Sequence, residues 1–145
     1  MNAISNGLIV TALGSLVSIV CHAQGLERGN LVGVHMVTVT LNPDATMDNF
    51  TRFYVREVIP EYERNWPGLK GYLLKSFFGD SKNKFAIVWL FKTVADRNRN
   101  FNPDGSANEL EKAALEKVKP IEDKLKKMCG SYTVQYTHED DWVVQ

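Results

Sequence analysis

One histidine stands out as a residue able to do acid–base chemistry. His35 lies within Val32–Leu41, a segment rich in β-branched residues that predicts a strand. A neutral imidazole can act as a general base near pH 7. Tyr72 and Tyr136 are candidates to orient such a base or to hold a substrate carbonyl, with ordinary packing as the alternative for both. The alternative for His35 is a structural histidine, hydrogen-bonded within the sheet or at a dimer contact.

Other reactive side chains fit structural interpretations. His138 stands beside Glu139, Asp140 and Asp141, and such a run is more typical of a solvated tail than of a metal site. Cys129 is expected to be a small buried hydrophobe without a disulfide partner. The sequence has no P-loop, no dinucleotide glycine pattern, no nucleophile elbow and no cysteine spacing typical of zinc. We therefore expect no metal and no cofactor.

The N-terminal segment has the features of a signal peptide. Leu8–Val20 is uncharged and about 13 residues long, which suits an h-region and is too short to cross a bilayer. Cys21-His22-Ala23 supplies small residues for cleavage before Gln24. Acylation at Cys21 is the alternative, but Val20 is a poor neighbour for it. We expect residues 1–23 to be removed, 24–30 to form a linker, and 31–145 to form one domain exported to the periplasm or the medium.

The mature chain is predicted to alternate strands and helices in the order β-α-β-β-α-β. Asp44 or Thr46 caps the first helix, and Pro60 kinks or breaks it. Ser106 and Glu109 match a capping box at the start of the second helix. Pro120 is expected to divide that helix and Gly130 to cap its end. The four predicted strands are Val32–Leu41, Lys70–Phe78, Lys84–Lys92 and Ser131–His138, with a hairpin loop at 79–83.

This order predicts an α+β, ferredoxin-like fold with a four-stranded antiparallel sheet in which the first and third strands are central. Both of those strands are apolar on their two faces, as in Phe85–Phe91. Two helices cover only one face of such a sheet. A second copy of the chain is the simplest cover for the other face, so we expect a homodimer.

The residues also resemble a known group of proteins. The resemblance rests on four features: His35 in the first strand, Pro60 in the first helix, Pro67–Tyr72 leading into the second strand, and Trp89–Phe91 in the third. In these features the chain resembles the dimeric α+β barrel superfamily, which includes stress-responsive A/B-barrel, antibiotic-biosynthesis monooxygenase-like and EthD-like proteins. The resemblance implies a dimeric α/β barrel, and in cyclase-like members a first-strand histidine acts as base. Haem-degrading members use a histidine on the second helix, which Ser106–Cys129 lacks.

Two classes of function remain open at this stage. One is a cofactor-free, monooxygenase- or cyclase-like enzyme acting on a small apolar or aromatic molecule with His35 as base. The other is a non-catalytic ligand-binding or stress-response protein with the same pocket. Equal numbers of acidic and basic residues, 17 of each, argue against nucleic acid as a partner, and we expect no membrane association after cleavage. Candidate pocket residues are Phe50, Phe53, Tyr54, Trp89 and Tyr136, for which core packing is the alternative.

Overall fold

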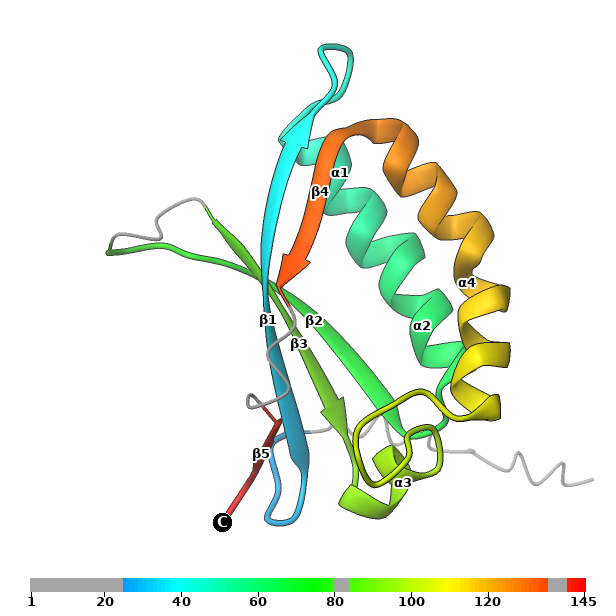
Figure 1. The fold of residues 1–145 in the computed structure, drawn as a ribbon. Coiled ribbons are helices and arrows are strands. Elements are labelled where there is room, and N and C mark those ends of the chain that lie inside the picture. Colours follow the sequence, from blue (N-terminus) through cyan, green and yellow to red (C-terminus); the bar gives the residue numbers. More distant parts are fainter. Residues whose placement is uncertain (1–24, 80–83, 136–140) are drawn as a thin grey trace, which may run out of the picture.

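The computed structural model describes residues 25–79, 84–135 and 141–145. The expected signal peptide, Cys21, most of the expected hairpin loop, Tyr136 and His138 lie outside these ranges. Helices cover one face of an antiparallel sheet and leave the other face without helices (Figure 1). The strands are β1 (Leu31–Leu41), β2 (Leu69–Lys75), β3 (Phe85–Phe91), β4 (Cys129–Gln135) and β5 (Asp141–Val143).

The strand order confirms the ferredoxin-like arrangement predicted from the sequence. The order is β2-β3-β1-β4, all antiparallel, so that β1 and β3 are central. The short strand β5 also pairs with β1, through Leu31–Gly33, and was not predicted. Because β5 adds to the edge of β1 beyond β4, it brings the C-terminal residues next to the start of the first strand.

The first helical region continues through Pro60, contrary to the expected break. It consists of α1 (Met47–Phe53), a π-helical turn η1 (Tyr54–Val58) and α2 (Ile59–Asn65). Pro60 lies in the first turn of α2, where its missing N–H is least costly, and the wider π turn precedes it. The cap is Thr46 rather than Asp44, since its hydroxyl oxygen accepts the N–H of Asn49 at 3.2 Å.

The second long helix differs from expectation at both ends and at its centre. The helix α4 (Glu109–Met128) is capped by Asn108, which accepts the N–H groups of Leu110 and Glu111, so the predicted Ser106 capping box is wrong. Pro120 does not divide α4, because this proline is exposed and water can hydrogen-bond the carbonyl it leaves unpaired. Gly130 lies in β4 and is not a helix cap.

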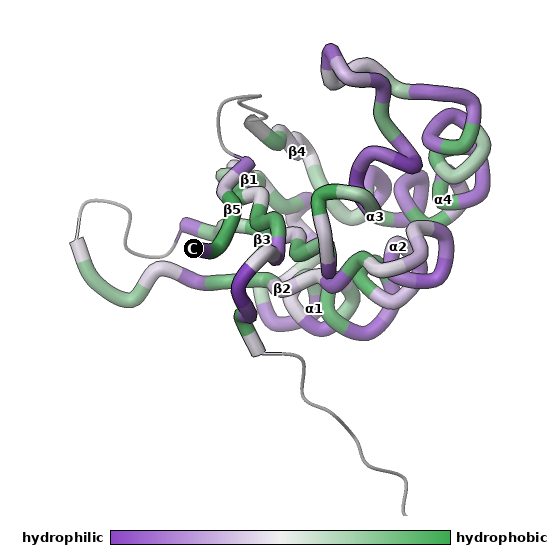
Figure 2. The backbone as a smooth tube through the Cα atoms, turned by 90° about the horizontal axis from the view of Figure 1, so that it is seen from below, coloured by the Kyte–Doolittle hydropathy of each residue, from purple (hydrophilic) through white to green (hydrophobic). Residues whose placement is uncertain are grey.

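The core lies between the helices and one face of the sheet. Phe50, Val58 and Val118 are fully buried there against Val37 and Phe85. Fully burying each such side chain stabilises the fold by about 1.5–3 kcal/mol. Hydrophobic residues also follow the strands, while much of the outer surface of the helices is hydrophilic (Figure 2). Cys129 is buried as predicted, and burial raises the pKa of its thiol.

A glycine in β2 sets how closely Trp89 lies to the sheet. A Cβ atom at Gly71 would lie 2.4 Å from Cζ3 of Trp89 and 2.9 Å from Cγ2 of Ile59. Such distances are shorter than any real carbon contact, so the indole occupies the space that a side chain at Gly71 would need. The glycine therefore allows β3 to place its tryptophan between β2 and α2.

We predict that Gly71→Ala lowers the free energy of unfolding by about 1–3 kcal/mol, because Trp89 must shift. Urea denaturation measures this change, and the near-ultraviolet circular dichroism of the indole should change with it. Gly25→Ala is the matched control, since its Cβ would meet nothing within 4 Å, and it should change stability by about 0.5 kcal/mol or less. Equal effects of the two variants would contradict the close packing of Trp89.

Candidate functional site

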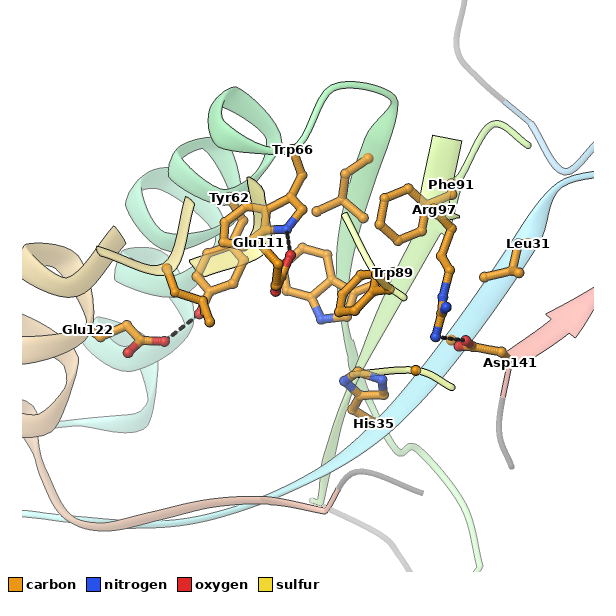
Figure 3. A pocket seen from close by; sticks show the side chains of 15 residues that line it. Leu31, His35, Tyr62, Trp66, Trp89, Phe91, Arg97, Glu111, Glu122 and Asp141 are labelled. Atoms are coloured by element: carbon orange, nitrogen blue, oxygen red, sulfur yellow. Dashed lines mark hydrogen bonds and ion pairs between the residues drawn. The ribbon is translucent and has the colours of Figure 1, made fainter. Parts of the chain in front are cut away.

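A cavity of about 360 Å³ lies between the helices and the sheet. Its volume is in the range of sites that hold small organic molecules. Apolar side chains form much of its wall, and five polar residues also line it (Figure 3). The apolar set is Leu31, Leu69, Trp89, Phe91, Phe101 and Leu115, and the polar set is His35, Arg97, Glu111, Glu122 and Asp141.

Three aromatic rings join the end of α2 to the sheet at this cavity. The rings of Tyr62 and Trp66 stack with centroids 5.0 Å apart and planes 9° apart. Tyr62 also stacks with Trp89 of β3, at 5.1 Å and 21°. Trp66 is only 3% exposed, so the stack is a rigid part of the cavity wall. Such contacts stabilise beyond the area they bury, by about 0.5–1.5 kcal/mol for each pair.

Two carboxyl groups of α4 are bound to this aromatic wall. The indole N–H of Trp66 donates a hydrogen bond to Oε2 of Glu111, and the hydroxyl of Tyr62 donates to Oε1 of Glu122. Glu111 is buried, and the loss of solvation raises the pKa of its carboxyl group. The Trp66 hydrogen bond and the positive charge of Arg97 partly oppose that shift. The wall therefore presents a carboxyl group held towards its neutral form.

The opposite side of the cavity carries a positively charged side chain, that of Arg97. Arg97 belongs to the short helix α3 (Val94–Asn98), and its guanidinium lies 4.6 Å from the centre of the Phe101 ring. Its Nη2 is 3.5 Å from Oδ2 of Asp141, which belongs to β5. The Arg97 side chain is 17% exposed and that of Asp141 is 37% exposed. A partly buried guanidinium can thus face whatever the cavity contains.

His35 and Asp141 approach each other across a glycine of β1. A Cβ atom at Gly33 would lie 3.1 Å from Oδ1 of Asp141 and 3.4 Å from Nε2 of His35. The carboxylate and the imidazole therefore share the space left by the missing side chain. Gly33 is opposite Asp141 in the β1–β5 register, which explains how the C-terminal strand reaches the site.

The sequence-predicted site residues fall in different places. His35 and Trp89 both line the cavity. Tyr72 does not, because its neighbour Gly71 faces Trp89 and successive residues of a strand point to opposite faces. Phe50 and Tyr54 are buried in the core and Phe53 packs against it, all outside the cavity lining.

Sequence reasoning missed several cavity residues. Glu111 gave a usable signal, since it lies three and seven residues before Ala114 and Val118 and so interrupts the apolar stripe of α4. Asp141 was interpreted only as part of an acidic run, and Tyr62 and Arg97 were not predicted as site residues. Neither Arg97 nor Asp141 carries a local pattern that indicates a cavity.

Metal and membrane features were also sought in the parts of the chain that the structure describes. In those parts, no group of three or more histidine, cysteine or acidic side chains is arranged to hold a metal ion. No helix among the described residues is both long and apolar enough to cross a bilayer.

Comparisons with known proteins give similarities of fold. No protein-family model matches the sequence, and no curated protein matches it. A solved structure of SnoaB, a cofactor-independent oxygenase from Streptomyces nogalater, is 16% identical with a TM-score of 0.41, covering 76% of this chain and 94% of that one. A NIPSNAP family protein of unknown function from Agrobacterium tumefaciens is 12% identical, with a TM-score of 0.47 and coverages of 82% and 93%.

A third solved structure, a putative antibiotic biosynthesis monooxygenase from Bacteroides thetaiotaomicron, is 14% identical with a TM-score of 0.39, covering 75% of this chain and 88% of that one. These three similarities are similarities of fold alone. The fold assignment itself rests on the element order and strand order of the chain.

We predict that Glu111 makes stability fall as pH rises. Its raised pKa means that the folded state keeps the proton to a higher pH than the unfolded state, whose value is near 4.5. Its stabilising contribution is therefore complete below that pH and is lost as pH rises through the folded pKa. Urea denaturation across this pH range should show that the free energy of unfolding falls less in Glu111→Gln than in the parent protein. Glu109→Gln, at an exposed position in the same helical turn, should behave like the parent protein. If the free energy of unfolding changes equally with pH in all three proteins, Glu111 is not the group responsible.

Proposed function

We propose that this protein binds a small, largely apolar or aromatic molecule in the cavity and that His35 acts there as a general base. The activity would be that of a cofactor-free, monooxygenase- or cyclase-like enzyme. The observation that carries the proposal is the position of His35, a titratable side chain on the strand floor of an aromatic-walled cavity.

The surroundings of His35 support this assignment chemically. Asp141 lies beside it across Gly33 and supplies a negative charge that would stabilise an imidazolium formed by proton abstraction. Glu111, on the facing helix, carries a carboxyl group whose pKa is raised by burial, and such a group can donate a proton. A base and an acid would then face the same ligand. Tyr72 is no part of this proposal, since it lies outside the cavity.

The alternative proposal is a binding protein that holds the same class of molecule without changing it. Both functions require an accessible cavity, and only the enzyme requires a base. A probe that reports proton abstraction therefore separates them. 2-Tetralone is suitable because it is a neutral bicyclic ketone whose α-protons exchange with D2O, and mass spectrometry counts the deuterium taken up.

We predict that the protein binds 2-tetralone and accelerates its deuterium uptake, and that His35→Gln reduces this acceleration at least about tenfold while leaving the Kd similar. Calorimetry measures the Kd. Leu115→Trp fills the cavity and should remove both binding and exchange. Leu110→Trp is the matched control, because Leu110 is 62% exposed on the same helix and outside the lining.

The possible outcomes distinguish the two functions. Binding without accelerated exchange, or exchange that survives His35→Gln, would favour the binding protein and remove His35 as base. Binding that survives Leu115→Trp would show that the probe does not occupy this cavity, and absence of binding would contradict both functions for this class of ligand.

We also propose that the mature chain is exported and forms a homodimer through the helix-free face of the sheet. That face presents exposed apolar side chains, with Met36 at 39%, Tyr72 at 42% and Leu74 at 50% exposure. Phe77 and Phe78, just beyond β2, are 90% and 89% exposed, and Figure 1 shows this end of β2 and β3 projecting away from α4. Large apolar patches of this kind are typical of protein interfaces. A second copy would cover the face and its projecting end.

We predict that the protein expressed from Met1 in a bacterial host with a secretion pathway has a native mass of twice residues 24–145. Native mass spectrometry measures both the cleavage site and the assembly. Leu74→Asp should give monomers, because a charge buried at an apolar interface is costly, whereas Leu110→Asp on α4 should remain dimeric. An intact N-terminus would contradict export, and a monomeric parent protein would contradict the interface.

A further inference from the structure

We propose that the ligand of this cavity is an aromatic carboxylate whose acid group binds Arg97 in the place that Asp141 holds in this structure. This inference rests on the proposed function, because it assumes that the cavity takes a small aromatic molecule. It adds the charge of that molecule and the residue that would select it.

Arg97 has more donor capacity than the described residues around it use. A guanidinium carries five N–H donors in one plane and suits a bidentate carboxylate. Among the described residues, its side chain has one ion pair, to Asp141, and that pair is long at 3.5 Å. The guanidinium carbon lies over the ring of Phe101, 4.6 Å from its centre, and this contact uses none of the N–H donors in a conventional hydrogen bond. A ligand carboxylate could therefore bind more closely than Asp141 does.

Asp141 is well placed to be displaced. It begins β5, a strand of three residues that are all exposed. Its side chain is 37% exposed, so a small rotation returns the carboxylate to water. An ion pair with one exposed partner and a separation of 3.5 Å contributes little to stability. The exchange of one carboxylate for another on Arg97 would leave the charge of the cavity unchanged.

The space at Gly33 connects this anion position to His35. Because Oδ1 of Asp141 and Nε2 of His35 lie within 3.1 and 3.4 Å of one missing Cβ position, a carboxylate in the place of Asp141 would lie beside the imidazole. The aromatic part of the ligand would then extend along Trp89, which lines the same cavity.

Glu111 and Glu122, on the acidic side of the cavity, favour a cationic ligand less than Arg97 favours an anionic one. Glu111 and Glu122 already accept hydrogen bonds from Trp66 and Tyr62. Burial also raises the pKa of Glu111 and so favours its uncharged form. These carboxyl groups are hydrogen-bonded to the aromatic wall, whereas Arg97 lines the cavity with its guanidinium directed at Asp141 (Figure 3).

Calorimetry with three probes of one shape tests the inference. The probes are 2-naphthoate, its neutral analogue 2-naphthamide, and the cation 2-naphthylmethylammonium, each titrated into the mature protein at pH 7. We expect 2-naphthoate to bind about tenfold more tightly than the amide. Arg97→Gln should remove that preference and leave amide binding unchanged, which also shows that the variant is folded.

Asp141→Asn gives the sharpest expectation, because it should strengthen 2-naphthoate binding several-fold by freeing Arg97. Arg99→Gln is the matched control: Arg99 makes a similar ion pair to Asp96, is 64% exposed and lies outside the cavity lining. This variant should bind all three probes as the parent protein does.

Three results would overturn the inference while leaving the proposed function in place: equal binding of naphthoate and naphthamide, preference for the ammonium probe, or weaker naphthoate binding in Asp141→Asn. Failure of all three probes to bind would instead contradict the cavity as an aromatic-ligand site, and the proposed function with it.

Discussion

The close approach of Trp89 to the backbone of β2 at Gly71 is the constraint on which the site depends. With no side chain at Gly71, the indole can lie between the sheet and α2, where Tyr62 stacks on it and Trp66 stacks on Tyr62. The stack links a central strand to the end of α2. The indole N–H of Trp66 and the hydroxyl of Tyr62 bind α4 through Glu111 and Glu122. One missing Cβ thus fixes the separation of the layers that enclose the cavity.

The two sides of the cavity consequently differ in rigidity. On the α4 side, the carboxyl groups are held by aromatic donors, and Trp66 and Glu111 are both nearly fully buried. On the β5 side, Arg97 and Asp141 come from a five-residue helix and a three-residue strand and form a single long ion pair. Elements with few buried contacts open at low free energy. A ligand would therefore be expected to enter and exchange partners on the β5 side, against a wall that does not move.

Strong periodic patterns in the sequence predicted the fold and part of the site. The β-branched segment around His35 and the apolar segment around Trp89 predicted β1 and β3. That His35 and Trp89 lie on the same face of the sheet follows from the register in which the two strands pair. Helix boundaries were harder, since Asn108 and Ser106 are both good caps. In the structure the Ser106 hydroxyl binds Asn102 and Asp104 of the preceding loop, and Asn108 caps α4 instead. Arg97 and Asp141 could not be predicted, because they meet only after β5 pairs with β1, and three residues carry too short a pattern to indicate that strand.

The alternation of side chains in β1, β2 and β3 gives the sheet two different faces. His35 and Trp89 face the helices and the cavity, while Met36, Tyr72 and Val88 belong to the other face. A register shift of one residue would exchange the two sets. The glycines oppose such a shift: Gly71 leaves room for the ring of Trp89, which a Cβ atom would meet at 2.4 Å, and at Gly33 a Cβ atom would lie 3.1 Å from Oδ1 of Asp141. The residues that make room for the cavity therefore also determine which apolar side chains lie on the helix-free face of the sheet.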